Sequence, residues 1–273
     1  MTSTSQSVKG ERKFVVVPGG KISYDVTGEG PVVLCLPSMG DTRREYERFV
    51  PALLKEGYKV ITTDLRGMGQ SRGSFVSHNI PDLKNDIQAI LDAEGEEKAY
   101  LLACSISGAS AGLFAIEHPE RVLGLIMLSP IMHTGPRFLS ALLAMLVRIP
   151  GLGKVIWNTY FKTLYPLHPV EKDYLDHVNE NLKFPGSMKS LADMAMAPRI
   201  DGQLQDIKAP TLIFFGSKDP DFKSVQAEAD KVQSEIPQAR VIVLDGIGHF
   251  PQRESSELVL PAVVEWLGGL REV

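Results

Sequence analysis

The stretch LLACSISGAS (residues 101–110) changes abruptly from an apolar run to a serine followed by small residues. The run predicts a strand and the segment after it predicts a helix, so Ser105 lies at the corner between them. A sharp corner needs small neighbouring side chains, and Ala103 and Ser107 are small. Ser105 is therefore a candidate nucleophile. A helix N-cap is the alternative interpretation, because serine is common at that position and the strict pattern G-x-S-x-G is absent.

Short apolar runs recur on both sides of this stretch without the alternation of a half-exposed strand, which predicts strands buried on both faces. Amphipathic segments between them predict crossover helices. We therefore expect an α/β fold with a mostly parallel, eight-stranded sheet and helices on both faces, preceded by a hairpin at Pro-Gly-Gly 18–20. The predicted strands are 13–17, 21–26, 31–36, 59–64, 98–104, 122–128, a strand within KAPTLIFFGSKDPDF (208–222) and 239–244, and the predicted helices are 44–57, 81–95, 106–120, 225–236 and 255–270.

The alternation of strands and helices stops between about 131 and 205, where only helical patterns occur. The sequence thus divides into a polar N-terminal segment (1–12), a core (13–130 and 206–273) and a helical insertion (131–205). Methionines and aromatic residues in the insertion are able either to line an adaptable apolar pocket or simply to pack against the core. These residues are Met132, Met145, Met188, Met194, Met196, Trp157, Tyr160 and Phe161.

A serine hydroxyl needs a base to take its proton, and the base needs an acid to orient it. His249 directly follows the last predicted strand, in a loop with glycines, and Asp219 follows the strand before it. Asp221 is the alternative acid. The chain order Ser, Asp, His, each after a different strand, is typical of enzymes with a nucleophile elbow.

The remaining histidines fit a catalytic base less well. His118 ends a predicted helix, where it is expected to be a partner for the helix end. The others lie in loops or in the insertion, and we expect most of them to be exposed to solvent; they are His78, His133, His168 and His177.

Several motifs resemble the alpha/beta-hydrolase superfamily, and the resemblance extends over about residues 13–270. DLRGMGQS (64–71) resembles the D-x-R-G-x-G-x-S loop of the superfamily, GSKD (216–219) its acid loop and GHF (248–250) its base loop. The insertion 131–205 resembles its cap domain.

The resemblance also implies roles for individual residues: Ser105 as nucleophile, His249 as general base and Asp219 as orienting acid. Spacing within the acid loop favours Asp219 over Asp221. The resemblance further implies an oxyanion hole made by the backbone N–H groups of Met39 and Ile106.

The sequence departs from the superfamily beside the predicted oxyanion hole, where Pro37 and Ser38 replace the common His-Gly. Backbone donation from Met39 is compatible with that change. Ser107 offers a second hydroxyl, but the strand length places the corner at Ser105.

The composition of the chain limits which classes of partner the protein is expected to bind. The 273 residues carry a net charge of −4, so no basic patch for nucleic acid is expected, and the partner is a small molecule. No membrane-spanning run or signal peptide is found, which predicts a cytoplasmic protein without stable membrane insertion. Cys35 and Cys104 are expected to be buried thiols, and no metal or cofactor is predicted. The oligomeric state is open.

The predicted function is cleavage of a small, apolar carboxylic ester or lactone through an acyl-serine intermediate. Carbon–carbon bond hydrolysis, thioester hydrolysis and perhydrolysis use the same triad and stay open. Epoxide hydrolases and dehalogenases of this fold need an aspartate at position 105, which here is serine. A ligand receptor without catalytic activity is the alternative from another class.

Overall fold

The computed structural model describes residues 10–135 and 137–271, so most of the predicted N-terminal segment 1–12 lies outside the described residues. Its sheet has the strand order β1-β2-β4-β3-β6-β7-β8-β9, with β5 paired to β2. The strands are β1 (Glu11–Val17), β2 (Gly20–Thr27), β3 (Val32–Leu36), β4 (Lys59–Thr63), β5 (Arg72–Gly73), β6 (Ala99–Cys104), β7 (Val122–Leu128), β8 (Thr211–Gly216) and β9 (Ala239–Leu244).

All eight predicted strands are present, and the predicted hairpin is the antiparallel pair β1 and β2. The strands from β3 onward in the sheet order pair in parallel, and every residue of β3, β6 and β8 is buried. This explains why those strands are continuous apolar runs. The ninth strand, β5, was not predicted because its two residues carry no detectable pattern.

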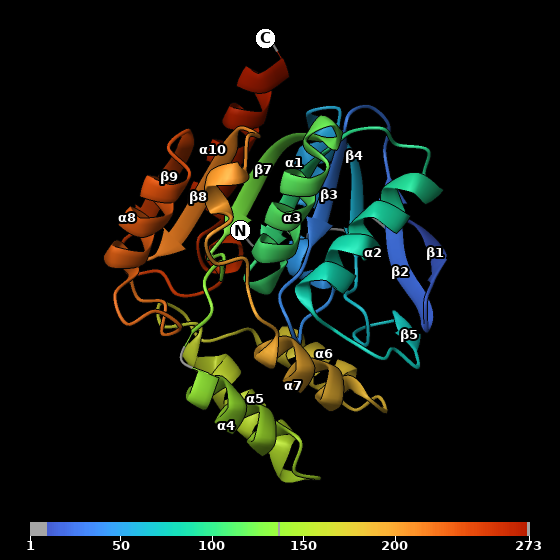
Figure 1. Ribbon diagram of the computed structural model, residues 1–273, viewed down its shortest axis with the longest axis vertical. Coiled ribbons are helices and arrows are strands. Elements are labelled where there is room, and N and C mark those ends of the chain that lie inside the picture. Colours follow the sequence, from blue (N-terminus) through green and yellow to red (C-terminus); the bar gives the residue numbers. More distant parts are fainter. Residues whose placement is uncertain (1–9, 136, 272–273) are drawn as a thin grey trace.

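Helices cover both faces of the sheet (Figure 1). The chain runs from β3 outward to β4, and then from β6 through β7 and β8 to β9 on the other side. Since parallel crossovers are right-handed, this reversal puts α1 (Val50–Lys55) on one face, and α2 (Ile80–Ala93), α3 (Ile106–Glu117) and α8 (Val225–Glu235) on the other. The last helix, α10 (Ser256–Arg271), lies beside α1, where Arg271 donates hydrogen bonds to the carbonyls of Glu56 and Gly57. Ligands of such sheets bind at the reversal point, beyond the carboxyl ends of the strands.

The predicted helix 44–57 is instead two short helices, η1 (Arg43–Tyr46) and α1. Pro51 sits in the first turn of α1. A proline has no N–H to bond to the preceding turn, so it interrupts a continuous helix and is tolerated in the first turn of a new one. A new helix therefore starts at this position.

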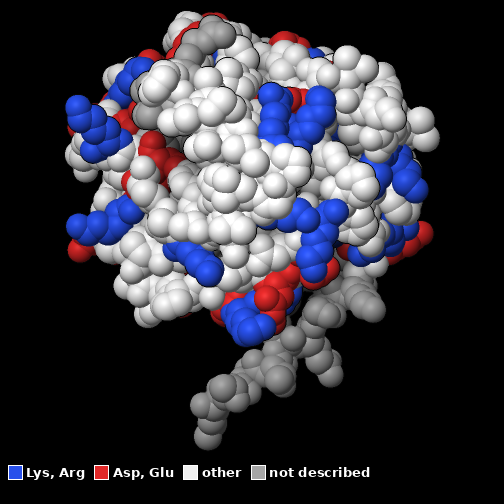
Figure 2. Space-filling view, turned by 90° about the horizontal axis from the view of Figure 1, so that it is seen from below, with Lys and Arg blue, Asp and Glu red and all other residues white. Residues whose placement is uncertain are grey.

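Four α-helices in the described part of the segment between β7 and β8 lie beyond the carboxyl ends of the strands (Figure 1). They are α4 (Arg137–Val147), α5 (Leu152–Thr163), α6 (Lys172–Asn181) and α7 (Ser187–Met196). The face of the molecule on this side is largely uncharged, with small groups of basic and acidic side chains that in several places lie next to each other (Figure 2). No helix among the described residues is both long and apolar enough to cross a membrane.

Candidate active site

Ser105 forms the corner between β6 and α3. Its backbone has φ 57° and ψ −123°, in a region that L-residues rarely occupy, so the corner is strained by roughly 1–3 kcal/mol. The strain is held by hydrogen bonds from Ser105 N to Leu128 O (3.0 Å) and from Ile131 N to Ser105 O (3.1 Å). The Ser105 side chain makes no capping hydrogen bond to α3. Ser105 therefore occupies the N-cap position of α3 without capping the helix through its side chain.

The residues flanking the corner are fully buried, which explains their small size. Ala103 and Ser107 have no exposed surface. The Ser107 hydroxyl donates to Pro37 O in the loop after β3, so it ties the start of α3 to that loop. Gly108 lies so close to Pro130 that a Cβ on it would come within 2.6 Å of that side chain.

His249 and two carboxylates form a buried cluster. Nδ1 of His249 donates to Asp219 Oδ2 at 2.7 Å, and Asp221 Oδ2 lies at 3.5 Å from the same nitrogen. Asp221 in turn accepts a hydrogen bond from the Tyr160 hydroxyl. Asp219 is therefore the carboxylate that bonds directly to the imidazole, and Asp221 is a second charge beside it.

Electrostatics in this cluster favour the protonated imidazole. Burial by itself lowers the pKa of His249, but the charges of Asp219 and Asp221 raise that pKa to about 9. Burial and the charge of Asp219 raise the pKa of Asp221. Both acids therefore raise the pKa of the base, and Asp221 itself is harder to ionise than a free aspartate.

The sheet brings this pair together because β8 and β9 are parallel neighbours. Asp219 follows the end of β8 and His249 follows the end of β9. Gly216 permits the close approach of the two loops, since a Cβ on it would lie 2.0 Å from Gly248 O. The backbone N–H of His249 donates to Leu164 O at 3.0 Å, so the loop also contacts the helical insertion.

Ser105 and His249 are each 2% exposed. Among the described residues no hydrogen bond joins the Ser105 hydroxyl to the imidazole. Nucleophile and base often draw together only when substrate is bound, so the open geometry is compatible with general base catalysis.

The N–H groups of Met39 and Ile106 donate to no acceptor among the described residues. Ile106 is the first residue of α3, where N–H groups have no partner within the helix. Met39 follows β3, which is the parallel neighbour of β6. Two free donors from adjacent strand ends are the arrangement that stabilises an oxyanion.

A buried glutamate holds the loop that contains Met39. Glu45 Oε2 accepts hydrogen bonds from both N and Oγ of Ser38 at 2.8 Å, and Glu45 Oε1 accepts one from Gln252 at 2.8 Å. The Gln252 amide also donates to Cys104 Sγ at 3.2 Å. Glu45 and Gln252 thus connect Ser38, in the loop after β3, to Cys104, which precedes Ser105. Both cysteines are buried thiols, as predicted.

A second carboxylate, Asp41, is buried near Glu45. It accepts hydrogen bonds from the Tyr174 hydroxyl (2.6 Å) and from Thr42 N (2.7 Å). Burial and the neighbouring charge of Glu45 raise the pKa of Asp41 to about 7. In the folded protein Asp41 therefore stays protonated at pH values well above those at which a carboxyl group usually ionises.

We expect Asp41→Asn to change how stability depends on pH. Because the pKa of Asp41 is higher in the folded than in the unfolded chain, its contribution to stability falls as pH rises from about 4 to about 7. The variant lacks this loss, so its stability relative to the wild type rises over that range, by on the order of a few kcal/mol. Urea unfolding midpoints between about pH 4 and 8 measure the difference. A difference independent of pH would contradict the assignment.

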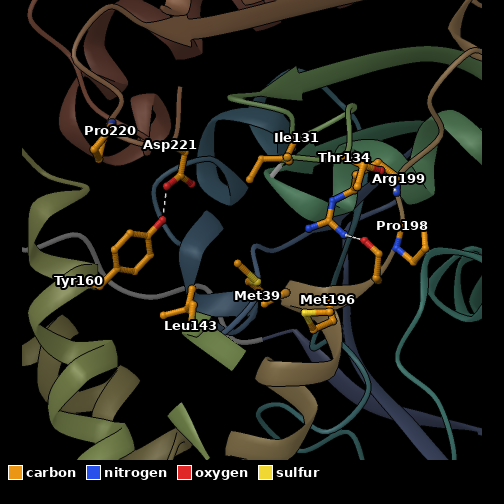
Figure 3. A pocket seen from close by; sticks show the side chains of 13 residues that line it. Met39, Ile131, Thr134, Leu143, Tyr160, Met196, Pro198, Arg199, Pro220 and Asp221 are labelled. Atoms are coloured by element: carbon orange, nitrogen blue, oxygen red, sulfur yellow. Dashed lines mark hydrogen bonds between the residues drawn. The ribbon is translucent and has the colours of Figure 1, made fainter. Parts of the chain in front are cut away.

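A cavity of about 530 Å³ lies between the insertion and the carboxyl edge of the sheet (Figure 3). It reaches Met39 and Asp221, which adjoin the groups described above, whereas Ser105 and His249 are buried and are not among the described residues that line it. The described lining residues are Met39, Ile131, Thr134, Gly135, Leu143, Tyr160, Ala195, Met196, Ala197, Pro198, Arg199, Pro220 and Asp221.

The methionines and aromatic residues of the insertion divide between the two expected roles. Tyr160 and Met196 line the cavity. Met132, Met194, Trp157 and Phe161 are buried in the hydrophobic core, whereas Met145 is exposed and Met188 packs against the core. Packing therefore accounts for most of them.

The expectation that most of the other histidines are exposed is wrong: His168 is exposed, whereas His133 and His177 are partly buried and His78 is buried. His78 is 4% exposed and bonds to Asp193 (3.1 Å) and Ser190 (2.9 Å) on α7, so it links the core to the insertion. His133 is also partnered, by Glu228 and Glu235 at 2.7 Å each. Neither partnership follows from local sequence, because the partners are about a hundred residues away.

The DLRGMGQS loop has a structural role. Asp64 accepts hydrogen bonds from Arg43 and from Gln70 N, and Arg66 donates to both carboxylate oxygens of Asp86. A Cβ on Gly69 would lie 2.0 Å from Asp64 Oδ2, so only glycine fits there.

One group among the described residues has three potential metal-ligand atoms within 4.8 Å of one another: Asp219, Asp221 and His249. These side chains already bond to each other and to Tyr160.

Known proteins resemble this chain over most of its length. A family model described as the alpha/beta hydrolase fold matches residues 31–155. A 2-hydroxy-6-oxononadienedioate/2-hydroxy-6-oxononatrienedioate hydrolase of Paraburkholderia phymatum is 28% identical, over 94% of this chain and 95% of the relative. Two solved structures share the fold. A thermophilic esterase from Thermogutta terrifontis has a TM-score of 0.82 at 23% identity, over 95% and 99% of the two chains. The enol-lactonase from Burkholderia xenovorans LB400 has a TM-score of 0.81 at 19% identity, over 94% and 100%.

Proposed function

The chain belongs to the alpha/beta-hydrolase superfamily and is a hydrolase, and we propose that it cleaves a carboxylic ester or lactone through an acyl-serine intermediate. In this proposal Ser105 is the nucleophile, His249 the general base and Asp219 the acid that orients it. The observation that carries the proposal is the 2.7 Å bond from His249 to Asp219, at the sheet edge where Ser105 occupies a strained corner.

The proposed reaction proceeds in two steps. His249 Nε2 takes the proton of Ser105 as its oxygen bonds to the acyl carbon, and the N–H groups of Met39 and Ile106 stabilise the oxyanion. The carbon–oxygen bond to the leaving group then breaks, and the alkoxide receives the proton from His249. In the second step His249 takes a proton from water, the water oxygen bonds to the acyl carbon, and Ser105 regains its proton as the carboxylic acid leaves.

A second candidate is carbon–carbon bond hydrolysis. The Paraburkholderia relative is named for a 2-hydroxy-6-oxo dienedioate, a ketone without an ester bond, whose hydrolysis breaks a carbon–carbon bond. The same serine and base serve that reaction. A panel of aryl esters, lactones and vinylogous diketones distinguishes the candidates, because kcat/KM is expected to be highest for the substrate class that the enzyme uses.

Residues 131–205 are proposed to be a cap over this site. The cavity beside Met39 is closed on one side by residues of α4, α5 and α7. The cap would therefore select substrates, while the core carries out the chemistry. The cytoplasmic location stays a prediction from the sequence.

We expect a fluorophosphonate probe to label the wild-type protein at Ser105, because an activated serine attacks phosphorus and forms a stable ester. Ser105→Ala should abolish labelling. Ser107→Ala is the matched control, since it removes the neighbouring hydroxyl and leaves the nucleophile in place. Tandem mass spectrometry of the labelled peptide identifies the modified residue.

The same experiment tests the receptor alternative. A wild-type protein that is folded and accessible but resists the probe would contradict the hydrolase mechanism and favour a ligand-binding role. Labelling at Ser107 would contradict the assignment of the nucleophile.

A further inference from the structure

Arg199 is the only cation among the described residues that line the cavity beside Met39. It lies in the segment that follows α7, and its guanidinium points into the cavity (Figure 3). Most of the surrounding wall is apolar, with Met39, Leu143 and Met196 close by. A charged group in such a wall needs a counterion or a set of hydrogen bonds.

The guanidinium is only partly satisfied by the chain. Nη1 donates to the carbonyls of Ala197 and Met194, the latter at 3.2 Å, near the end of α7. Nε is buried without a hydrogen-bond partner. No hydrogen bond from Nη2 and no ion pair of Arg199 is formed with the described residues. The edge of the guanidinium that carries Nε and Nη2 therefore has two unused donors.

The acids nearest to Arg199 are bonded elsewhere. Asp201 accepts two hydrogen bonds from the backbone N–H of Thr134, at 3.0 and 3.1 Å, and a further one from the Thr134 hydroxyl. Asp221, the acid on the cavity wall, accepts from Tyr160 and faces His249. Burial lowers the pKa of Arg199 to about 10, so the side chain remains a cation at neutral pH.

We propose that Arg199 binds a carboxylate of the substrate, and that the enzyme prefers substrates with a carboxylate on the acyl side, remote from the scissile bond. Paired donors on one edge of a guanidinium match the two oxygens of a carboxylate. The preference for carboxylates rests on the proposed hydrolase function, whereas the binding of carboxylates by Arg199 does not. The expectation of an entirely apolar substrate is revised by this inference.

A matched pair of esters tests the preference: mono-4-nitrophenyl adipate, which has a free carboxylate, and its methyl ester, which is neutral. Arg199→Gln should lower kcat/KM for the adipate by about 10- to 100-fold and change that for the methyl ester by less than about 3-fold. Arg199→Lys keeps the charge but not the paired donors, so its kcat/KM for the adipate should lie between those of the wild type and Arg199→Gln. Arg148→Gln is the control, because it removes a cation that directly follows α4 and is not among the described residues that line the cavity.

Equal losses for the two esters would overturn the proposal and indicate that Arg199 only supports the end of α7. Thermal unfolding of Arg199→Gln shows whether the fold is intact. An unchanged preference for the adipate in the folded variant would also overturn it.

A binding experiment separates this proposal from the proposed function. Hexanoate should bind the Ser105→Ala protein more tightly than hexanamide in isothermal titration calorimetry, and Arg199→Gln in the same background should remove the difference. If neither ester is hydrolysed but hexanoate binding depends on Arg199, the hydrolase proposal fails and the carboxylate site stands. If esters are hydrolysed but hexanoate and hexanamide bind equally, the carboxylate site fails.

Discussion

Replacing His249 with alanine is expected to lower kcat for an activated ester by about 10⁴- to 10⁶-fold while the protein stays folded. The loss is large because Ser105 then has no group to take its proton. The elbow and the N–H groups of Met39 and Ile106 are unaffected, so a small residual rate above the uncatalysed reaction should persist. Steady-state kinetics with a 4-nitrophenyl ester measure the effect.

Two further variants make this result interpretable. His249 is buried and bonds to Asp219, so the alanine variant leaves Asp219 Oδ2 without its donor and loses stability. His249→Gln keeps a donor for Asp219 but has no basic nitrogen, and it should be as inactive as the alanine variant. His118→Ala, at the end of α3, should retain full activity. A rate for folded His249→Gln within about tenfold of the wild type would contradict a role as base.

Chain order alone predicts the central residues of the site, because the fold is repetitive. In a parallel sheet every strand ends at the same edge, so residues just after β6, β8 and β9 must converge there. Ser105, Asp219 and His249 each occupy such a position, and their residue types are those that the proposed triad requires. The strands themselves were predictable because buried parallel strands need uninterrupted apolar runs.

Other parts of the site depend on contacts that leave no local pattern. Glu45 and Gln252 are 207 residues apart, and nothing near either one indicates the bond between them. In the sequence Arg199 is indistinguishable from an ordinary charged loop residue. Only the structure shows that it lines a cavity and that its Nε has no hydrogen-bond partner. Cys104 and Ser38, unexplained in the sequence, are members of the same buried hydrogen-bond chain.

Asp219→Asn is expected to lower kcat by about 10³- to 10⁴-fold, with KM nearly unchanged. Asp219 accepts the Nδ1 proton of His249, which leaves Nε2 free to act on Ser105. An asparagine in its place is able to present an amide N–H to Nδ1, which stabilises the tautomer with the proton on Nε2. That tautomer cannot take the proton of a serine. Kinetics with the same 4-nitrophenyl ester provide the measurement.

Asp221→Asn is the matched control, because it removes the same charge from the residue that lies 3.5 Å from Nδ1 without bonding to it. At high pH the kcat of this variant should be within about tenfold of the wild-type value. The base must be neutral to act, so kcat/KM of the wild type should rise with pH through the pKa of His249, about 9. Loss of one nearby negative charge lowers that pKa, and the rise should move to lower pH in Asp221→Asn. If Asp221→Asn were inactive and Asp219→Asn active, Asp221 would be the acid of the triad, and the 2.7 Å bond to Asp219 would be only structural.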